Sequence, residues 1–153
     1  MARSARKTRK TPRKRPSNTV VFQGLPGAYS HLATRHVFPD MHPLPVAAFE
    51  DTFAAVRDGK AKFAMTPIEN SVAGRVADIH RLMPESGLYI VAEHFMRVNH
   101  HLLAPKGANL KGLRVVRSHV HALSQCNKAI RRLGLEPVAH ADTAGAAKEL
   151  AER

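Results

Sequence analysis

The side chains best suited to chemistry in this chain are neutral hydrogen-bonding groups that come directly after apolar, strand-like runs. They are Ser30, Asn70, Ser71, Ser118, His119 and Thr143. Where such a side chain precedes a helix, the helix start adds unpaired backbone N–H groups and a partial positive charge. Each junction could therefore hold an anion, and a small carboxylate fits best. Taken singly, each serine or threonine is also explained as a plain helix N-cap.

Gln125 is a further candidate because of its place on a predicted helix. Between His121 and Leu133 the apolar residues recur at helical spacing, and Gly134 follows as a helix stop. By helical angle Gln125 lies at the edge of this apolar stripe, where its amide can face a cleft while its neighbours face the core. The amides of Gln125 and Asn70 are harder to explain as plain caps than the hydroxyls are.

Other kinds of chemistry find little support in the sequence. The adjacent His100 and His101 would point to opposite faces of an extended strand and cannot chelate one ion together. There is no H-E-x-x-H motif and no second cysteine beside Cys126, so we expect no metal site. The sequence also has no P-loop and no G-x-G-x-x-G after a strand, which argues against binding of a nucleotide phosphate.

The positive charge of the chain is concentrated at its beginning. Residues 1–18 hold eight of the 24 Lys and Arg residues and no acid, whereas the remaining 16 cations face 12 acids. We expect residues 1–18 to be a disordered basic tail, because they lack apolar side chains that could repay ordering. A nucleic-acid role would rest on this tail alone, and we do not expect one.

Composition also bounds the compartment. A single cysteine cannot form an internal disulfide, which fits a reducing compartment, and we expect a cytoplasmic protein. No apolar run approaches the roughly 20 residues of a membrane-spanning helix, so we expect no membrane partner.

Strand-like and helical patterns alternate along the chain. We expect strands within residues 19–24, 44–48, 62–66, 113–119 and 136–141, with prolines confining the second of them to a sheet edge or its start. We expect helices from near Ser30, from Phe49 to before Gly59, over 76–83, over 121–133, and from Asp142 or Thr143 to Leu150. This alternation indicates an α/β fold with a mostly parallel sheet, in which ligands bind beyond the carboxyl ends of the strands.

The long apolar run from Leu88 to Ala104 is unusual for one strand. We interpret it as a strand that leaves one lobe, crosses over near residues 99–101 and enters a second lobe. The expected organisation is a first α/β lobe over residues 19–98 and a second, incomplete α/β lobe over residues 99–153.

Four stretches with these residues resemble the prephenate dehydratase family. They are "FQGLPGAYSH" (22–31), "TPIENSVAG" (66–74), "SHVHALSQC" (118–126) and "DTAGAA" (142–147). The resemblance implies a two-lobed α/β domain of the type II periplasmic-binding-protein kind, with the active site between the lobes and no metal or organic cofactor. It implies conversion of prephenate to phenylpyruvate on the route to phenylalanine, and a homodimer in the full-length protein.

The resemblance also assigns roles to individual residues. By the family pattern Asn70, Gln125 and Ser118 match catalytic-site positions, and Ser71, Ser30, His119 and Thr143 match positions that line or support the substrate cleft. We expect the helix starts at Ser30, Asn70 and Ser118 to hold the two substrate carboxylates. Gln125 is expected to help orient the leaving hydroxyl group.

The sequence departs from the family pattern in its last part. The family's proposed proton donor is a threonine in a threonine-arginine-phenylalanine motif some tens of residues beyond the last predicted helix, and this chain has no such motif. We therefore expect a truncated catalytic domain that is inactive by itself. Two alternatives stay open: a non-catalytic module that binds a small carboxylate, and a dehydratase that prefers arogenate.

Overall fold

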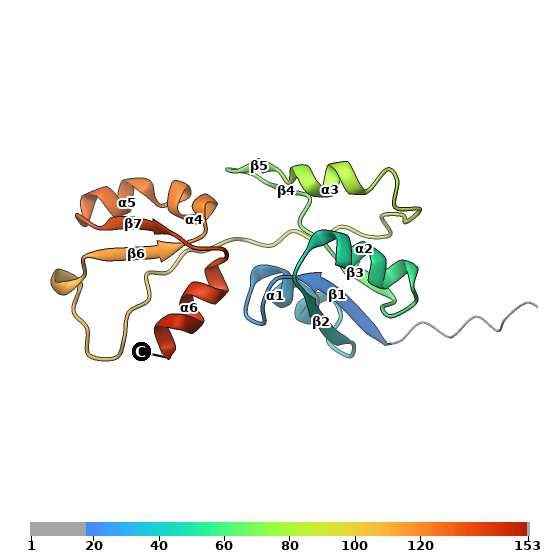
Figure 1. The fold of residues 1–153 in the computed structure, drawn as a ribbon, viewed down its shortest axis with the longest axis horizontal. Helices are drawn as coiled ribbons and strands as arrows, with labels where there is room; N and C mark the ends of the chain where they lie inside the picture. Colours follow the sequence, from blue (N-terminus) through green and yellow to red (C-terminus); the bar gives the residue numbers. More distant parts are fainter. Residues whose placement is uncertain (1–17, 153) are drawn as a thin grey trace, which may run out of the picture.

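The computed structural model describes residues 18–152, so the predicted basic tail lies outside the described residues except for Asn18. Figure 1 shows the helices and strands in two groups that are joined by a long extended segment. Each group contains parallel strands with helices beside them. The α/β architecture predicted from the sequence is confirmed.

The first group is built on a parallel sheet of three strands in the order β2-β1-β3. The strands are β1 (Thr19–Gln23), β2 (His42–Val46) and β3 (Phe63–Met65). The central strand β1 holds the three consecutive side chains Val20, Val21 and Phe22 at 0% exposure, because both of its edges and both of its faces are covered. The edge position of β2, predicted from Pro43 and Pro45, is confirmed; a proline has no N–H to donate to a further strand.

Helices α1 (Tyr29–Val37) and α2 (Phe49–Arg57) pack on this sheet. The Asp51 carboxylate accepts a hydrogen bond from the N–H of Ala48 at 3.3 Å at the start of α2. The helix ends near Gly59, whose φ of 73° lies in the left-handed region that glycine tolerates. Both the start and the stop of this helix agree with the prediction.

A hairpin follows β3, and it was not predicted. Strands β4 (Glu69–Asn70) and β5 (Gly74–Arg75) pair antiparallel, and helix α3 (Ala77–Leu82) begins after them. The expectation that Asn70 stands at a helix start is therefore wrong. The chain reverses after Asn70, whose side-chain oxygen accepts from the backbone N–H groups of Val72 and Ala73 in the turn.

The second group contains two parallel strands, β6 (Val115–Ser118) and β7 (Glu136–Ala139), whose register aligns Ser118 with Ala139. Its helical elements are the 3-10 helix η1 (Leu110–Gly112), α4 (Val120–Gln125), α5 (Asn127–Arg132) and α6 (Thr143–Ala151). The single helix predicted over residues 121–133 is wrong in one respect. The backbone at Cys126, with φ −92° and ψ 3°, separates it into α4 and α5.

The run from Leu88 to Ala104 is extended but forms no strand, which corrects the prediction of a strand there. Among the described residues, no backbone-to-backbone hydrogen bond is made by residues 88–104. Tyr89 and Phe95 are 88% and 83% exposed. The apolar, β-branched composition favours a strand, but a strand exists only where a neighbouring chain accepts its hydrogen bonds.

Candidate active site

A cleft of about 500 Å³ lies between the two groups of elements. One wall is formed by residues 23–25 after β1 and by residues 45–47 at the end of β2, and the other by Ala141 and Asp142 after β7. All three segments are carboxyl ends of parallel strands, which is where open α/β sheets bind ligands. The cleft is therefore the natural place for a substrate.

Ser118 and Thr143 meet beside this cleft. The Ser118 hydroxyl at the end of β6 donates to the Thr143 hydroxyl at the start of α6, with 3.2 Å between the two oxygens. Thr143 directly follows Asp142, a residue of the cleft wall. The sequence placed both residues at strand tips, and the parallel pairing of β6 with β7 brings those tips together.

The start of α6 is fixed by Asp142 and His140. The Asp142 carboxylate caps the helix by accepting from the N–H of Gly145 at 2.6 Å, which confirms one of the two predicted caps. The His140 ring contacts the Asp142 backbone oxygen through Nδ1 at 2.7 Å and the Glu149 carboxylate through Nε2 at 3.0 Å. The Glu149 carboxylate, and then the Asp142 carbonyl, raise the pKa of His140 above its ordinary value. Glu149 also pairs with Arg117 of β6 at 3.2 Å, which ties α6 to the strand that ends in Ser118.

His119 caps the start of α4. Its Nδ1 atom accepts from the N–H of His121 at 3.3 Å, and the two rings lie edge to face with centroids 4.9 Å apart. His119 is the N-cap of α4, so the predicted polar position after β6 is a helix start.

Gln125, the last residue of α4, contacts the extended segment. Its Oε1 atom lies 2.9 Å from Nε2 of His100. The neighbouring residue Asn99 is held by Tyr29 at the start of α1: the Tyr29 hydroxyl donates to the Asn99 carbonyl at 2.5 Å and accepts from the Asn99 N–H at 2.9 Å. Residues 99 and 100 are therefore contacted from both groups of elements.

Asn70 and Ser71 lie in the β4–β5 hairpin. The Asn70 side-chain oxygen accepts from the N–H groups of Val72 and Ala73, both at 2.9 Å, so it closes the turn. Its amide NH₂ group is left for another partner, and Ser71 is exposed. Among the described residues, no hydrogen bond joins Asn70 to Gln125, Ser118 or Thr143.

Ser30 lies inside α1 and does not cap it. The N-cap is Ala28, which corrects the suggested role of Ser30 as a cap. The Ser30 carbonyl accepts from the hydroxyl of Thr34 at 2.8 Å. Three residues of the site region escaped the sequence analysis: Tyr29, His100 and His140. Tyr29 and His100 are revealed by partners 70 and 25 positions away in the sequence, whereas the partners of His140 lie two and nine positions along the chain.

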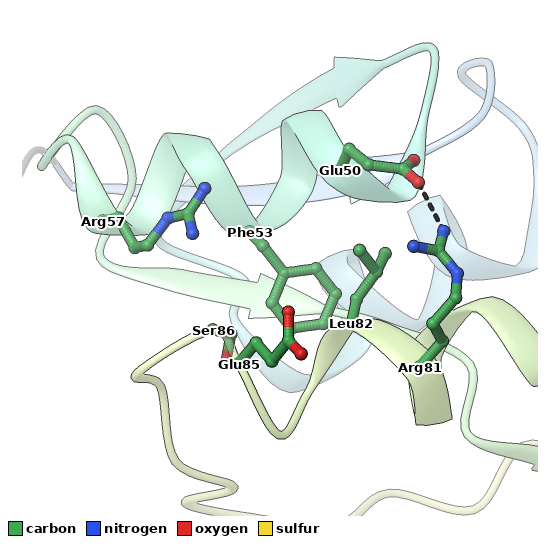
Figure 2. Close-up of a pocket in the computed structure, with 7 residues that line it drawn as sticks. All are labelled: Glu50, Phe53, Arg57, Arg81, Leu82, Glu85 and Ser86. Atoms are coloured by element: carbon green, nitrogen blue, oxygen red, sulfur yellow. Dashed lines mark hydrogen bonds and ion pairs between the residues drawn. The ribbon is translucent and has the colours of Figure 1, made fainter.

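A smaller hollow of about 220 Å³ lies between α2 and α3 (Figure 2). Phe53 and Leu82 form its apolar floor, and Arg81 donates to the Glu50 carboxylate at 2.7 Å on its rim. A hydrogen bond from its own backbone N–H and the contact with Arg81 lower the pKa of Glu50. None of the predicted site residues lines this hollow, which separates it from the cleft between the two groups.

Two further findings concern the described part of the chain. Within residues 18–152 no group of three His, Cys, Asp or Glu side chains is arranged to hold a metal ion. Over the same residues no helix combines the length and the hydropathy that crossing a membrane requires.

The elements form a two-lobed α/β protein with a cleft lined by the ends of parallel strands. The chain belongs to the prephenate dehydratase family, because the family's model matches residues 20–153. The resemblance seen in the sequence is thereby confirmed. The solved prephenate dehydratase of Staphylococcus aureus has the same fold, with a TM-score of 0.71 at 20% identity over 86% of this chain and 51% of that one.

Two curated relatives are similar over nearly the whole chain. A bifunctional N-acyl-homoserine lactone acylase/prephenate dehydratase of Komagataeibacter europaeus is 51% identical over 133 residues, which are 87% of this chain and 47% of the relative. The chloroplastic arogenate dehydratase/prephenate dehydratase 2 of Arabidopsis thaliana is 41% identical over 132 residues, 86% of this chain and 35% of the relative. The chain thus spans half or less of the length of these relatives.

Proposed function

We propose that this chain supplies the substrate cleft of a prephenate dehydratase, which converts prephenate to phenylpyruvate, carbon dioxide and water. The observation that carries the proposal is the Ser118–Thr143 hydroxyl pair, 3.2 Å apart beside the cleft in a chain of this family. Prephenate offers two carboxylates and a ring hydroxyl, all of which accept hydrogen bonds. Hydroxyl and amide side chains are suited to such groups.

The chemistry needs positioning more than a strong acid or base. Cleavage of the bond to the ring carboxylate sends its electron pair into the ring, and the ring hydroxyl departs with a proton as water. The aromatic product supplies the driving force. The protein must hold the dianion, offer a hydrogen bond to the leaving oxygen, and keep water from the ring carboxylate.

We assign the catalytic positions to Asn70, Gln125 and Ser118. Asn70 and Gln125 each keep an amide NH₂ group after their oxygens have been used, in the hairpin turn and in the contact with His100. The substrate-binding positions of the proposal are Ser71, Ser30, His119 and Thr143. No metal or organic cofactor enters this proposed reaction.

Isosteric acids test these assignments while they keep the protein contacts. Asn70→Asp and Gln125→Glu retain the oxygen that accepts in the turn or contacts His100, but they replace the NH₂ donor by a negative charge. We expect calorimetric binding of prephenate to weaken by at least about tenfold, because a lost charge-assisted hydrogen bond costs roughly 1.5–3 kcal/mol. Asn127→Asp is the matched control, because Asn127 is exposed at the start of α5, and this variant should bind as the parent does. Equal affinity of all three variants would remove Asn70 and Gln125 from the site.

Turnover distinguishes the enzyme from a binding module. Phenylpyruvate formation is followed with the same protein that is used in calorimetry. Turnover would support the dehydratase and exclude the binding module, whereas binding of prephenate without turnover agrees with the non-catalytic carboxylate module and equally with a truncated dehydratase domain. Competition between prephenate and arogenate then decides the substrate preference, since relatives of both kinds are similar to the chain.

A second candidate function comes from the 51% identical relative, whose name includes an N-acyl-homoserine lactone acylase. Hydrolysis of an amide requires a nucleophile with a base or an activated water. Among residues 18–152, the hydrogen-bond partner of the Ser118 hydroxyl is Thr143, which is not a base. This arrangement favours the dehydratase, and release of homoserine lactone from an N-acyl-homoserine lactone would favour the acylase.

We further propose that the full-length protein is a cytoplasmic homodimer that does not bind nucleic acid. The family resemblance supports the dimer, and the single cysteine fits a reducing compartment. Light scattering of the eluting protein measures the oligomeric state, and retention on DNA before and after deletion of residues 1–18 tests the tail.

A further inference from the structure

The two residues Asn99 and His100 are the point where the extended segment is held from both lobes. Tyr29 of α1 makes two hydrogen bonds to the backbone of Asn99, one as donor and one as acceptor. His100 contacts Gln125 of α4 through its side chain. Residues 88–104 make no backbone-to-backbone hydrogen bond in the described chain, so these side-chain contacts fix the segment at this point.

The contact with His100 sets the orientation of the Gln125 amide when the His100 ring carries its proton on Nε2. An imidazole Nε2 that carries a proton can only donate, and the atom of Gln125 that faces it is Oε1 at 2.9 Å. The amide nitrogen then points away from the ring with both hydrogens. Among the described residues, this nitrogen has no hydrogen-bond partner, and Gln125 is half-buried.

We propose that His100 is a positioning residue for Gln125 and that Tyr29 keeps His100 in place through Asn99. The arrangement makes Gln125 a donor in the site, so the ligand must present an acceptor oxygen at that point, such as a carboxylate, carbonyl or hydroxyl oxygen. This inference rests on the proposed function only in placing Gln125 at the substrate. The ordering of Gln125 by His100 and Tyr29 does not depend on which substrate is bound.

Nuclear magnetic resonance of the full 153-residue chain without ligand tests the ordering. The Gln125 side-chain NH₂ signal is assigned by its loss in Gln125→Glu, and its heteronuclear NOE reports its mobility. We expect a rigid amide in the parent, a mobile one in His100→Ala, and a restored one in His100→Gln, which returns an NH donor to the same region. Tyr29→Phe should also mobilise Gln125, although Tyr29 does not touch it.

Tyr89→Phe is the matched control, because Tyr89 is 88% exposed and the same single oxygen is removed. It should leave the Gln125 signal unchanged. If the amide has the same mobility in the parent, His100→Ala and Tyr29→Phe, the inference is wrong. Should His100→Ala lower the melting temperature, His100→Gln and Tyr29→Phe still decide the question.

Calorimetry with prephenate connects the ordering to binding. We expect His100→Ala to weaken binding about threefold to tenfold, as expected for one hydrogen bond. In the double variant with Gln125→Ala the loss should not exceed that of Gln125→Ala alone, because His100 acts through Gln125. Additive losses would overturn the positioning role. A parent protein that binds no prephenate would contradict the proposed function, and the measurements without ligand would still decide the role of His100.

Discussion

Replacement of Gly145 by alanine should destabilise the start of α6, against the usual preference of helices for alanine. A Cβ atom on Gly145 would lie 2.7 Å from Oδ2 of Asp142 and 3.0 Å from Cε1 of His140. The same Asp142 carboxylate caps the helix by accepting from the Gly145 N–H at 2.6 Å. The new methyl group can be accommodated only if Asp142 moves and gives up this cap.

The expected change in the free energy of unfolding combines two costs and one gain. Loss of an aspartate N-cap costs about 0.5–2 kcal/mol, and crowding of a packed position costs about 1–3 kcal/mol. The gain from alanine over glycine in a helix is at most about 1 kcal/mol. We therefore expect Gly145→Ala to lower the free energy of unfolding by about 0.5–4 kcal/mol. In an Asp142→Ala background the cap is already absent and Oδ2 is removed, so the same change should cost at least about 1 kcal/mol less.

Urea unfolding followed by far-UV circular dichroism measures both values. Gly112→Ala is a close control, because Asn109 caps η1 in the same way with its Oδ1 atom 2.8 Å from the Gly112 nitrogen. There the added Cβ would lie 3.4 Å from Oδ1, an ordinary contact, and stability should change little. Equal effects of Gly145→Ala in the parent and in the Asp142→Ala background would refute the reasoning.

Three further predictions concern the pH dependence and the core. The pKa of His140 is raised above 6.5, so the contribution of this residue to stability is present below pH 6.5 and is lost as the pH rises through the folded-state pKa. The melting temperature of His140→Gln should therefore depend less on pH across this range than that of the parent. The pKa of Glu50 is lowered from 4.5, so its contribution is present above pH 4.5 and is lost on further acidification, and Glu50→Gln should remove this dependence from acid unfolding curves. Val21→Ala should cost about 2 kcal/mol in urea unfolding because Val21 is fully buried, whereas Val72→Ala at 74% exposure should cost little.

The elements of both sheets could be predicted because their signals are local. The run Val20–Phe22 is apolar on both faces and becomes the buried centre of the first sheet. The prolines of β2 restrict it to an edge through a missing donor, which is a property of the residues themselves. The polar residues that end these strands then lie where parallel sheets place ligands.

The hairpin at Asn70 was missed because the same residues suit two local structures. A strand followed by a polar residue can lead to a helix start or to a turn, and Asn70 is favourable in both. Gly74, with a φ of 80°, resolves the choice in favour of the hairpin, since the left-handed conformation returns the chain as β5. The break at Cys126 is similar, because the apolar stripe continues through it at helical spacing.

The partners of the site residues lie far away in the sequence, and this limits what a sequence reading can find. Gln125 and His100 are 25 positions apart, and Tyr29 and Asn99 are 70 apart. Position at a strand tip identified Ser118, and position at the edge of a helical apolar stripe identified Gln125, since both depend on neighbours in the chain. The contact of Gln125 with His100 depends on the path of the extended segment through the fold. The apolar run from Leu88 to Ala104 does not show which distant residues it will contact.

That route also connects the most exposed apolar part of the described chain to the candidate site. The side chains of Tyr89 and Phe95 are exposed to solvent, ten and four residues before Asn99, in the same stretch of backbone without ladder hydrogen bonds. A backbone without ladder hydrogen bonds is restrained by side-chain contacts, here those made by Tyr29 and Gln125 at residues 99 and 100 and the contact of the His94 ring with the His36 ring, whose centroids lie 5.2 Å apart. Because Asn99 and His100 continue this backbone directly, we expect a contact that orders residues 89–98 to change the position of His100, and through the proposed positioning role to change the donor group of Gln125.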